Sequence, residues 1–151
     1  MEMTGEQHVP VSQEKTWQAL NDLDVLKACI PGCETIVASG ENEYDVVLTA
    51  KVGPVSAKFK GKLKLSDMNP PSSYNLAFEG QGGVAGFARG SAQVNLTPEG
   101  GEATLLGYAV KANVGGKLAQ IGSRLIDGAA RKLAEQFFSA FNKHVSATGE
   151  A

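Results

Sequence analysis

The chain has 151 residues, 42% of them hydrophobic and 20% charged, and its net charge at pH 7 is −2. This balance excludes intrinsic disorder, which combines few apolar residues with a high net charge. It also disfavours a nucleic-acid partner, because phosphate backbones are bound by clustered basic side chains. We therefore expect one folded domain over 1–147 and a disordered tail at 148–151.

The first part of the chain predicts a short strand followed by two short helices. The strand is expected over 2–10, and Ser12 is a suitable N-cap for the first helix. The second helix is expected over 24–30, because Asp22 and Asp24 suit a helix start and a proline-glycine pair follows.

The middle of the chain predicts an antiparallel sheet. Apolar and polar residues alternate, as they do in half-buried strands, over 44–52, 55–66, 74–79, 88–96 and 104–114. Short segments rich in glycine or proline join these runs, so we expect a meander in which neighbours in sequence are neighbours in the sheet. With the N-terminal strand included, the sheet should hold about seven strands.

A long amphipathic helix is predicted near the C-terminus. From Leu118 to Val145, apolar residues recur at steps of three and four, and polar residues occupy the opposite side. The apolar side of this helix has to be covered, and the sheet offers the apolar face that can cover it. The expected fold class is therefore α+β, with a curved antiparallel sheet around the last helix and two short helices after the first strand.

Small residues on both of these elements raise the question of a cavity between them. Gly122 and Gly128 are expected in the helix interior, where each costs about 1 kcal/mol relative to alanine. Ala129 and Ala130 are expected on the side that faces the sheet. Small residues also occupy the inferred inward strand positions Gly61, Ala88, Gly90, Ala92 and Ala112. The pattern fits an internal pocket and equally a filled core in which helix and sheet approach closely.

A pocket in this place would have mostly apolar walls, with Tyr108 as its main polar group. Such walls suit a hydrocarbon chain or an aromatic ring system. The predicted ligand-binding residues are Leu26, Ile30, Leu48, Val52, Phe59, Phe78, Phe87, Tyr108, Val110, Leu118, Ile121, Gly122 and Leu125.

Four lysines alternate along one expected strand and so share one face of it. They are Lys58, Lys60, Lys62 and Lys64. Such a row suits anionic lipid headgroups or an acidic partner. It also suits a solvated outer face that charge keeps soluble, which is the interpretation we favour.

The sequence offers no constellation typical of catalysis or of metal binding. The glycine-rich segment 79–87 lies between two expected strands, whereas a phosphate-binding loop follows a strand and opens a helix. No histidine accompanies a serine or cysteine nucleophile, and His8 and His144 lie near opposite ends of the chain. Cys29 and Cys33 form an isolated pair in a chain without a secretion signal. We expect them to be reduced thiols, and we expect neither a metal nor a cofactor.

Several strings of the sequence resemble the CoxG family, the family of the G subunit of carbon monoxide dehydrogenase. They are LND at 20–22, VLKACIPGCE at 25–34, KVGPV at 51–55, FKGK at 59–62, EG at 79–80, GF at 86–87 and VGGKLAQ at 114–120. The strings cover nearly the whole chain in order, and ACIPGC at 28–33 is the most specific of them.

The resemblance implies a helix-grip fold of the START and polyketide-cyclase-like superfamily, whose members enclose hydrophobic ligands between the sheet and the last helix. It also implies an accessory role beside an aerobic carbon monoxide dehydrogenase or a related molybdenum hydroxylase, in maturation, membrane attachment or electron delivery to quinone. Some similar proteins carry a further linker and an apolar tail, whereas this sequence stops at Ala151. We therefore expect membrane contact to be peripheral.

Three functions remain open at this point. The first is a non-catalytic cytoplasmic carrier of a lipid or isoprenoid quinone, which serves a molybdenum hydroxylase and meets the inner face of the cell membrane peripherally. The second is an interaction module with a filled core that works through its lysines. The third is an enzyme of the same superfamily, such as a cyclase or a hydrolase.

Overall fold

A computed structural model of the protein describes residues 1–149, and the side chains of residues 1–146. The described strands are β1 (Glu2–Val9), β2 (Cys33–Gly40), β3 (Glu43–Val52), β4 (Val55–Asn69), β5 (Ser73–Gln81), β6 (Phe87–Pro98) and β7 (Thr104–Gly115). The described helices are α1 (Gln13–Leu20), α2 (Leu23–Cys29), the 3-10 helix η1 (Gly83–Ala85), α3 (Lys117–Gln120) and α4 (Ser123–Gly149). The predicted α+β class is confirmed, and residues 150–151 of the predicted tail lie outside the described residues.

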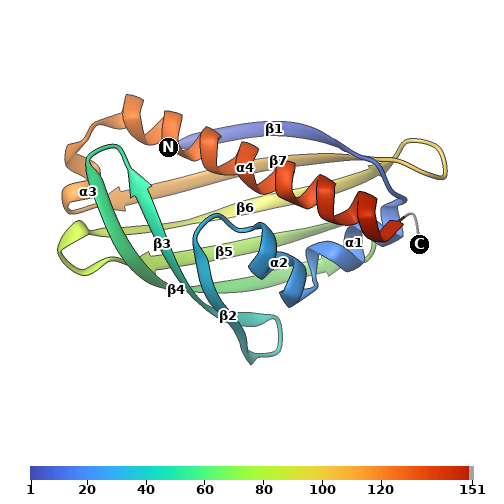
Figure 1. Ribbon diagram of the computed structural model, residues 1–151, viewed down its shortest axis with the longest axis horizontal. Coiled ribbons are helices and arrows are strands. Elements are labelled where there is room, and N and C mark those ends of the chain that lie inside the picture. The colour runs from blue at the N-terminus through green and yellow to red at the C-terminus, as the bar shows by residue number, and fades with distance from the viewer. Residues whose placement is uncertain (150–151) are drawn as a thin grey trace.

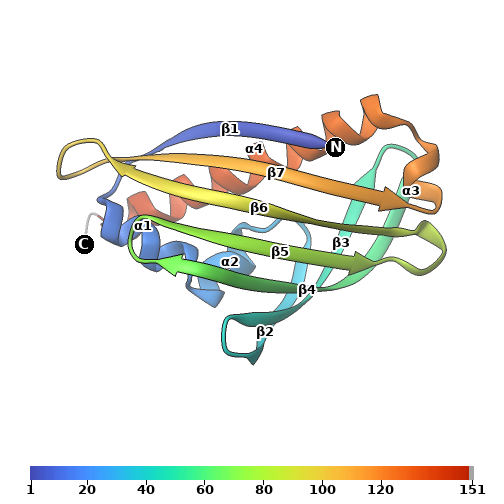
Figure 2. The same ribbon diagram turned by 180° about the vertical axis from the view of Figure 1, so that it is seen from behind.

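The strands form a single antiparallel sheet in the order β1-β7-β6-β5-β4-β3-β2. The sheet curves around α4, which runs along its inner side in Figure 1, and Figure 2 shows the outer face of the sheet from behind. Strands β2 to β7 follow one another in sheet order as they do in sequence, so the predicted meander is confirmed. Strand β2 is not one of the strands that alternation predicts. Ile36 is its one buried residue and the rest of the strand is largely exposed, so apolar and polar residues do not alternate along it.

Helix α1 begins directly after Ser12 as the sequence predicts, and α2 begins at Leu23, one residue before the predicted residue 24. Ser12 caps α1, and its side-chain oxygen accepts a hydrogen bond from the Lys15 amide at 3.3 Å. Asp22 caps α2, and its carboxylate accepts a hydrogen bond from the Asp24 amide at 2.9 Å. Each cap satisfies an amide that has no partner inside its helix.

One end of the molecule is closed by its main hydrophobic core. The buried members of this core are Val9, Val11, Leu20, Val25, Cys29, Tyr74, Val94, Leu96, Leu106, Phe138, Phe141 and Val145. They come from the two short helices, the C-terminal half of α4 and the strands that these helices cover. We call this group the main core, and it fixes the C-terminal half of α4 on the sheet.

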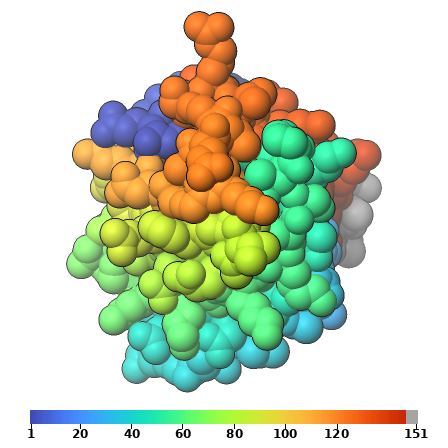
Figure 3. Space-filling view, turned by 90° about the vertical axis from the view of Figure 1, so that its left-hand side faces the viewer, coloured from blue at the N-terminus to red at the C-terminus, as the bar shows by residue number. Residues whose placement is uncertain are grey.

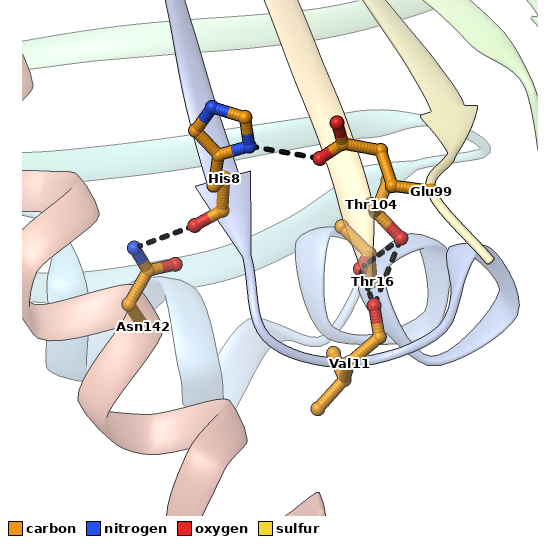
Figure 4. A network of polar contacts seen from close by, with 6 residues as sticks. All are labelled: His8, Val11, Thr16, Glu99, Thr104 and Asn142. Carbon is orange, nitrogen blue, oxygen red and sulfur yellow. Dashed lines mark hydrogen bonds and ion pairs between the residues drawn. The ribbon is translucent and has the colours of Figure 1, made fainter. Parts of the chain in front are cut away.

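A buried polar network also joins the elements at this end (Figure 4). Thr104 donates a hydrogen bond to the Val11 carbonyl at 2.9 Å, and the hydroxyl oxygens of Thr16 and Thr104 lie 3.3 Å apart. Neither threonine has exposed surface. The Asn142 side chain of α4 donates to the His8 carbonyl of β1 at 3.3 Å. These contacts tie α1 and the turn before it to the start of β7, and they tie α4 to β1.

The C-terminal helical region is two helices and not one continuous helix. Gly122 separates α3 from α4 with a φ of +92°, a conformation that favours glycine. Its carbonyl accepts the first hydrogen bond of α4, from the Ile126 amide at 3.1 Å. The predicted position of Gly122 inside a helix is therefore wrong. Gly128 does lie inside α4 as predicted, but it is exposed and a Cβ there would meet nothing within 4 Å, so it faces away from the sheet.

Two inward glycines are required where the sheet bends. A Cβ at Gly61 would overlap the carbonyl oxygen of Glu79 on β5, and a Cβ at Gly90 would overlap the carbonyl oxygen of Lys111 on β7. These glycines allow neighbouring strands to approach closely, as glycines do at bends in curved sheets. They therefore shape the sheet and do not by themselves leave empty volume above it.

Candidate functional site

The inner face of the sheet is apolar and is closed at both ends. The main core closes one end. At the other end, Phe59 of β4, Ala85 of η1 and Leu118 of α3 are buried against one another. We call these three residues the tip cluster. Partly buried side chains of β3, β4 and β7 pack around it, namely Leu48, Ala50, Val52, Val55, Ala57 and Val114.

Several inward side chains of the central strands belong to neither of these clusters. Four of them are Leu63, Phe78, Ala92 and Val110, and we call these four the middle section. Leu63 pairs with Phe78 across β4 and β5, and Ala92 pairs with Val110 across β6 and β7. All four remain partly accessible to solvent, although they face the side of the sheet on which α4 lies. These four residues are therefore less completely buried than the buried members of the two clusters.

The covered side of α4 carries small residues along the same stretch. Ile126, Ala130, Ala134 and Phe138 follow one another at four-residue steps and therefore share one face. Phe138 is held in the main core, and Ile126 is buried near the other end of the helix. The two alanines between them are only partly buried. These alanines are therefore the small side chains on the covered face of α4 between Ile126 and Phe138.

Tyr108 borders the middle section on the side of the main core. It lies two residues before Val110 on the same face of β7, and its ring stacks on Phe138 with the ring centroids 5.4 Å apart. Its hydroxyl lies over Gly5 of β1, where a Cβ would overlap it. Tyr108 is partly accessible, so it offers a hydroxyl at the edge of an otherwise apolar surface.

The structure brings part of the predicted ligand-binding set together on the inner face. Leu48, Phe59, Phe78, Tyr108 and Val110 all occupy inward positions of their strands. Val52 packs on the tip cluster, of which Leu118 is a member. Leu26 and Ile30 are half-buried on or directly after α2, which packs against β2 and α4.

The remaining predicted residues lie outside the middle section. Phe87 is on the outer face of the sheet, where the Arg89 guanidinium lies 5.6 Å from the centre of its ring. Ile121 and Leu125 lie against the turn between β3 and β4, and Leu125 is 53% exposed. Gly122 is exposed between α3 and α4.

Some residues of this inner surface are missing from the predicted set. Leu63 alternates with the lysines of β4, so the period that places Phe59 inward also places Leu63 inward. Ala134 follows Ala130 at a helical step, and the same spacing could have identified it. The signal for both residues is therefore present in the sequence.

The four lysines of β4 lie on the outer face, and three of them form ion pairs with acids of β2 and β3. The pairs are Lys58 with Glu34 at 3.3 Å, Lys62 with Asp45 at 3.1 Å, and Lys64 with Glu43 at 3.7 Å. A hydrogen bond from Thr49, together with the contact with Lys58, lowers the pKa of Glu34. The positive charge of this lysine row is thus largely balanced by its neighbours.

A hollow of about 550 Å³ opens on this outer face. Lys62, Lys64, Glu79 and Arg89 surround it, with the small side chain of Ala77 between them. These residues carry charges of both signs and lie on the opposite side of the sheet from α4. Leu63 and Phe78 of the middle section are also among the residues that line this hollow.

Groups suited to nucleophilic or acid–base chemistry lie outside the middle section. Burial raises the pKa of the Cys29 thiol and also that of Cys33, which keeps both thiols protonated. Burial likewise raises the pKa of Tyr74, a member of the main core. Within residues 1–149, no group of three or more histidine, cysteine or acidic side chains is arranged to hold a metal ion.

The sequence and the fold of the chain are similar to those of known proteins. The family model of the carbon monoxide dehydrogenase G subunit (CoxG) matches residues 5–146. A conserved protein from Geobacillus kaustophilus shares 32% sequence identity with a TM-score of 0.93, over 98% of this chain and 97% of that one. None of the curated proteins matches the chain.

More distant structures share the fold. A START superfamily protein from Mycobacterium smegmatis is 13% identical with a TM-score of 0.75, over 97% of this chain and 98% of that one. The ZhuI aromatase/cyclase from Streptomyces sp. R1128 is 11% identical with a TM-score of 0.71, over 97% of this chain and 93% of that one. The predicted family resemblance and the predicted helix-grip fold are both confirmed.

Proposed function

Because the chain belongs to the CoxG family of carbon monoxide dehydrogenase subunits, we propose that it is a non-catalytic accessory protein that carries a hydrophobic small molecule. The cargo is a lipid or an isoprenoid quinone, which lies between the middle section and α4. The protein serves an aerobic carbon monoxide dehydrogenase or a related molybdenum hydroxylase, in its maturation, its membrane association or its electron delivery.

The observation that supports this proposal is the accessibility of the apolar middle section. Leu63, Phe78 and Val110 point toward α4 and yet are not fully buried. Each methylene group that moves from water into an apolar surrounding contributes about 0.8 kcal/mol. The burial of these side chains by an apolar ligand would therefore contribute favourably to the free energy of binding.

The walls of the space determine the chemistry of the guest. The middle section, Ala130 and Ala134 supply only hydrocarbon surface, and Tyr108 supplies one hydroxyl at the edge. A quinone carbonyl or a lipid ester could accept a hydrogen bond from that hydroxyl while the rest of the molecule contacts hydrocarbon. A charged metabolite would lose its hydration without gaining an ionic partner from the middle section.

The same walls favour a carrier over an enzyme. One structure with this fold is an aromatase/cyclase, so the fold itself is compatible with catalysis. Catalysis in such a space requires a titratable group at the reacting atoms. The four residues of the middle section have hydrocarbon side chains, and the buried titratable residues Cys29 and Tyr74 belong to the main core. Tyr108 at the edge is thus the one titratable side chain that we place beside the ligand.

We place the protein in the cytoplasm, with peripheral contact at the inner face of the cell membrane. Cys29 and Cys33 are free thiols, which agrees with a reducing compartment. None of the helices within residues 1–149 is long and apolar enough to span a bilayer. Peripheral contact would allow the carrier to exchange its cargo with the membrane.

Thermal unfolding with and without decylubiquinone tests the proposal. A ligand at about 100 times its Kd stabilises a protein by about 2.7 kcal/mol, which raises the Tm of a chain of this size by roughly 5 to 10 °C. We expect this shift for the native protein. We expect no shift for Ala130→Trp, because the indole fills the space beneath α4.

Gly128→Ala is the matched control, because it changes the same helix at an exposed position where a Cβ meets nothing within 4 Å. It should keep the full ligand shift and add up to about 1 kcal/mol of stability from helix propensity. Ala130→Leu repeats the test with a smaller side chain if the tryptophan variant does not fold. The proposal fails if neither decylubiquinone nor palmitic acid shifts the native Tm, or if both Ala130 variants keep the native shift.

A further inference from the structure

Three segments that are far apart in the sequence meet at one end of the molecule. They are the β3–β4 hairpin at 51–56, the β5–β6 turn at 80–90 and the β7–α4 connection at 114–126. Figure 3 looks onto this end, which is the left-hand side of Figure 1. We call the surface of these three segments the tip end.

Contacts between the segments make the tip end one surface. A Cβ at Gly53 of the hairpin would lie 3.7 Å from Ile121 and 3.8 Å from Leu125, so the hairpin lies against the start of α4. Gly86 and Gly116 approach each other so closely that neither has room for a Cβ. The tip cluster, which also draws on three separate elements, is buried beneath these contacts.

Two large apolar side chains of the tip end project into solvent. Val84 of η1 is 85% exposed, and Leu125 in the first turn of α4 is 53% exposed. Among the residues that the structure describes, only Val37 on β2 is a further large apolar residue with comparable exposure, at 54%. A single exposed apolar residue is ordinary. Two of them on one end, beside several basic side chains, suit a surface that meets a partner.

The charged residues within the three segments of the tip end are basic, while Glu79 and Asp127 directly adjoin them and Glu79 pairs in register with Arg89 across β5 and β6. The segments contain Lys51, Arg89, Lys117 and Arg124, and they contain neither aspartate nor glutamate. All four basic side chains are exposed, and within residues 1–149 none of them forms an ion pair. Since the whole chain has a net charge of −2, the tip end concentrates positive charge on an acidic protein.

We propose that the tip end docks on a membrane surface that contains anionic lipids. Val84 and Leu125 enter the interface at the level of the headgroups, and the four basic side chains lie among the lipid phosphates. This inference rests on the proposed function, because a carrier of membrane-soluble cargo has to reach the bilayer. It also sets an orientation, in which the tip cluster faces the membrane and the main core faces away from it.

The lysine row on the outer face is the competing surface for an anionic partner. Three of its lysines already have acidic partners within 4 Å, and no large apolar side chain of β4 is exposed. The lysine row therefore lacks both the unbalanced charge and the inserting groups of the tip end. A valine that is 85% exposed on a turn also suits a fluid interface, which needs no complementary pocket.

Cosedimentation with lipid vesicles tests this inference. One set of vesicles contains equal amounts of phosphatidylcholine and phosphatidylglycerol, and the other contains phosphatidylcholine alone. We expect the native chain to bind the anionic vesicles, with an affinity that falls as salt rises. Lys117→Gln with Arg124→Gln should weaken this binding about 25-fold, at about fivefold for each basic residue. Val84→Ser with Leu125→Ser should weaken it as well.

Matched variants on other surfaces control for charge and for exposed apolar area. Lys60→Gln with Lys64→Gln removes the same charge from the lysine row, and Val37→Ser removes an exposed apolar side chain from β2. Both should bind anionic vesicles within about twofold of the native chain. The inference is overturned if the lysine-row variant loses as much binding as the tip-end variant. It is also overturned if the native chain ignores anionic vesicles, which would leave the basic tip end to an acidic protein.

The decylubiquinone Tm shift, measured without vesicles, separates this inference from the proposed function. The tip-end variants change exposed side chains and should keep both the native fold and the native ligand shift. Loss of vesicle binding with an intact ligand shift would locate the defect in docking. A missing ligand shift in a native chain that still binds vesicles would instead count against the cargo.

Discussion

Gly61 and Gly80 face each other across β4 and β5, but their surroundings differ. A Cβ at Gly61 would overlap the backbone of Glu79, whereas a Cβ at Gly80 would lie 3.9 Å from the Cβ of Phe59. We expect Gly61→Ala to lower the free energy of unfolding by about 1 to 3 kcal/mol, because the strands have to move apart. Gly80→Ala should change it by less than about 1 kcal/mol. Urea denaturation of both variants measures the difference.

Equal stability of the two alanine variants would show that β4 and β5 separate at Gly61 without cost, and it would remove our explanation of the bend.

The pair Gly61 and Gly80 also shows a limit of sequence interpretation. Alternation alone predicts that Gly61 faces inward. Whether a missing side chain leaves space or admits a neighbouring strand depends on register and curvature, which the local sequence does not encode.

At the scale of the elements, a single hydroxyl joins the turn before α1 to the start of β7. Thr104→Val removes the group that donates to the Val11 carbonyl at 2.9 Å and changes the side-chain volume little. We expect it to lower the free energy of unfolding by about 1 to 3 kcal/mol, because buried polar groups lose their partner. Thermal unfolding monitored by circular dichroism measures the change.

Thr97→Val on β6 makes the same substitution at an exposed site and should change the stability by less than about 0.5 kcal/mol. If Thr104→Val costs no more than this control, then the network in Figure 4 does not hold this end together.

The elements differ in how well the sequence predicts them, for a physical reason. Caps such as Ser12 and Asp22 bond to an amide two or three residues further along the chain, so the local sequence is enough to predict them. The apolar period at Leu118, Ile121 and Leu125 continues across Gly122, because α3 and α4 both turn apolar residues toward the tip end. Periodicity reports which face is covered and does not report whether the helix is continuous.

At the scale of the whole molecule, strand order follows from short turns and is predicted from the sequence. The residues that we propose to line a ligand space beneath α4 are only partly predicted. Phe78 and Val110 are predicted on the inner face and Ala130 on the covered side of α4, whereas Ala134 is not among the predicted residues and Gly122 and Gly128 are exposed. The height of the helix over the sheet is set by the main core and the tip cluster. These clusters join residues distant in sequence, so no local pattern reveals the space between them.

Native mass spectrometry of protein purified without detergent tests most directly whether an apolar molecule occupies the space beneath α4. We expect the native chain and Gly128→Ala to retain an added mass that solvent extraction identifies as a lipid or an isoprenoid quinone. Ala130→Trp should appear at the mass of the bare chain. A native chain that is itself bare, or an equal bound mass in Ala130→Trp, would contradict the account.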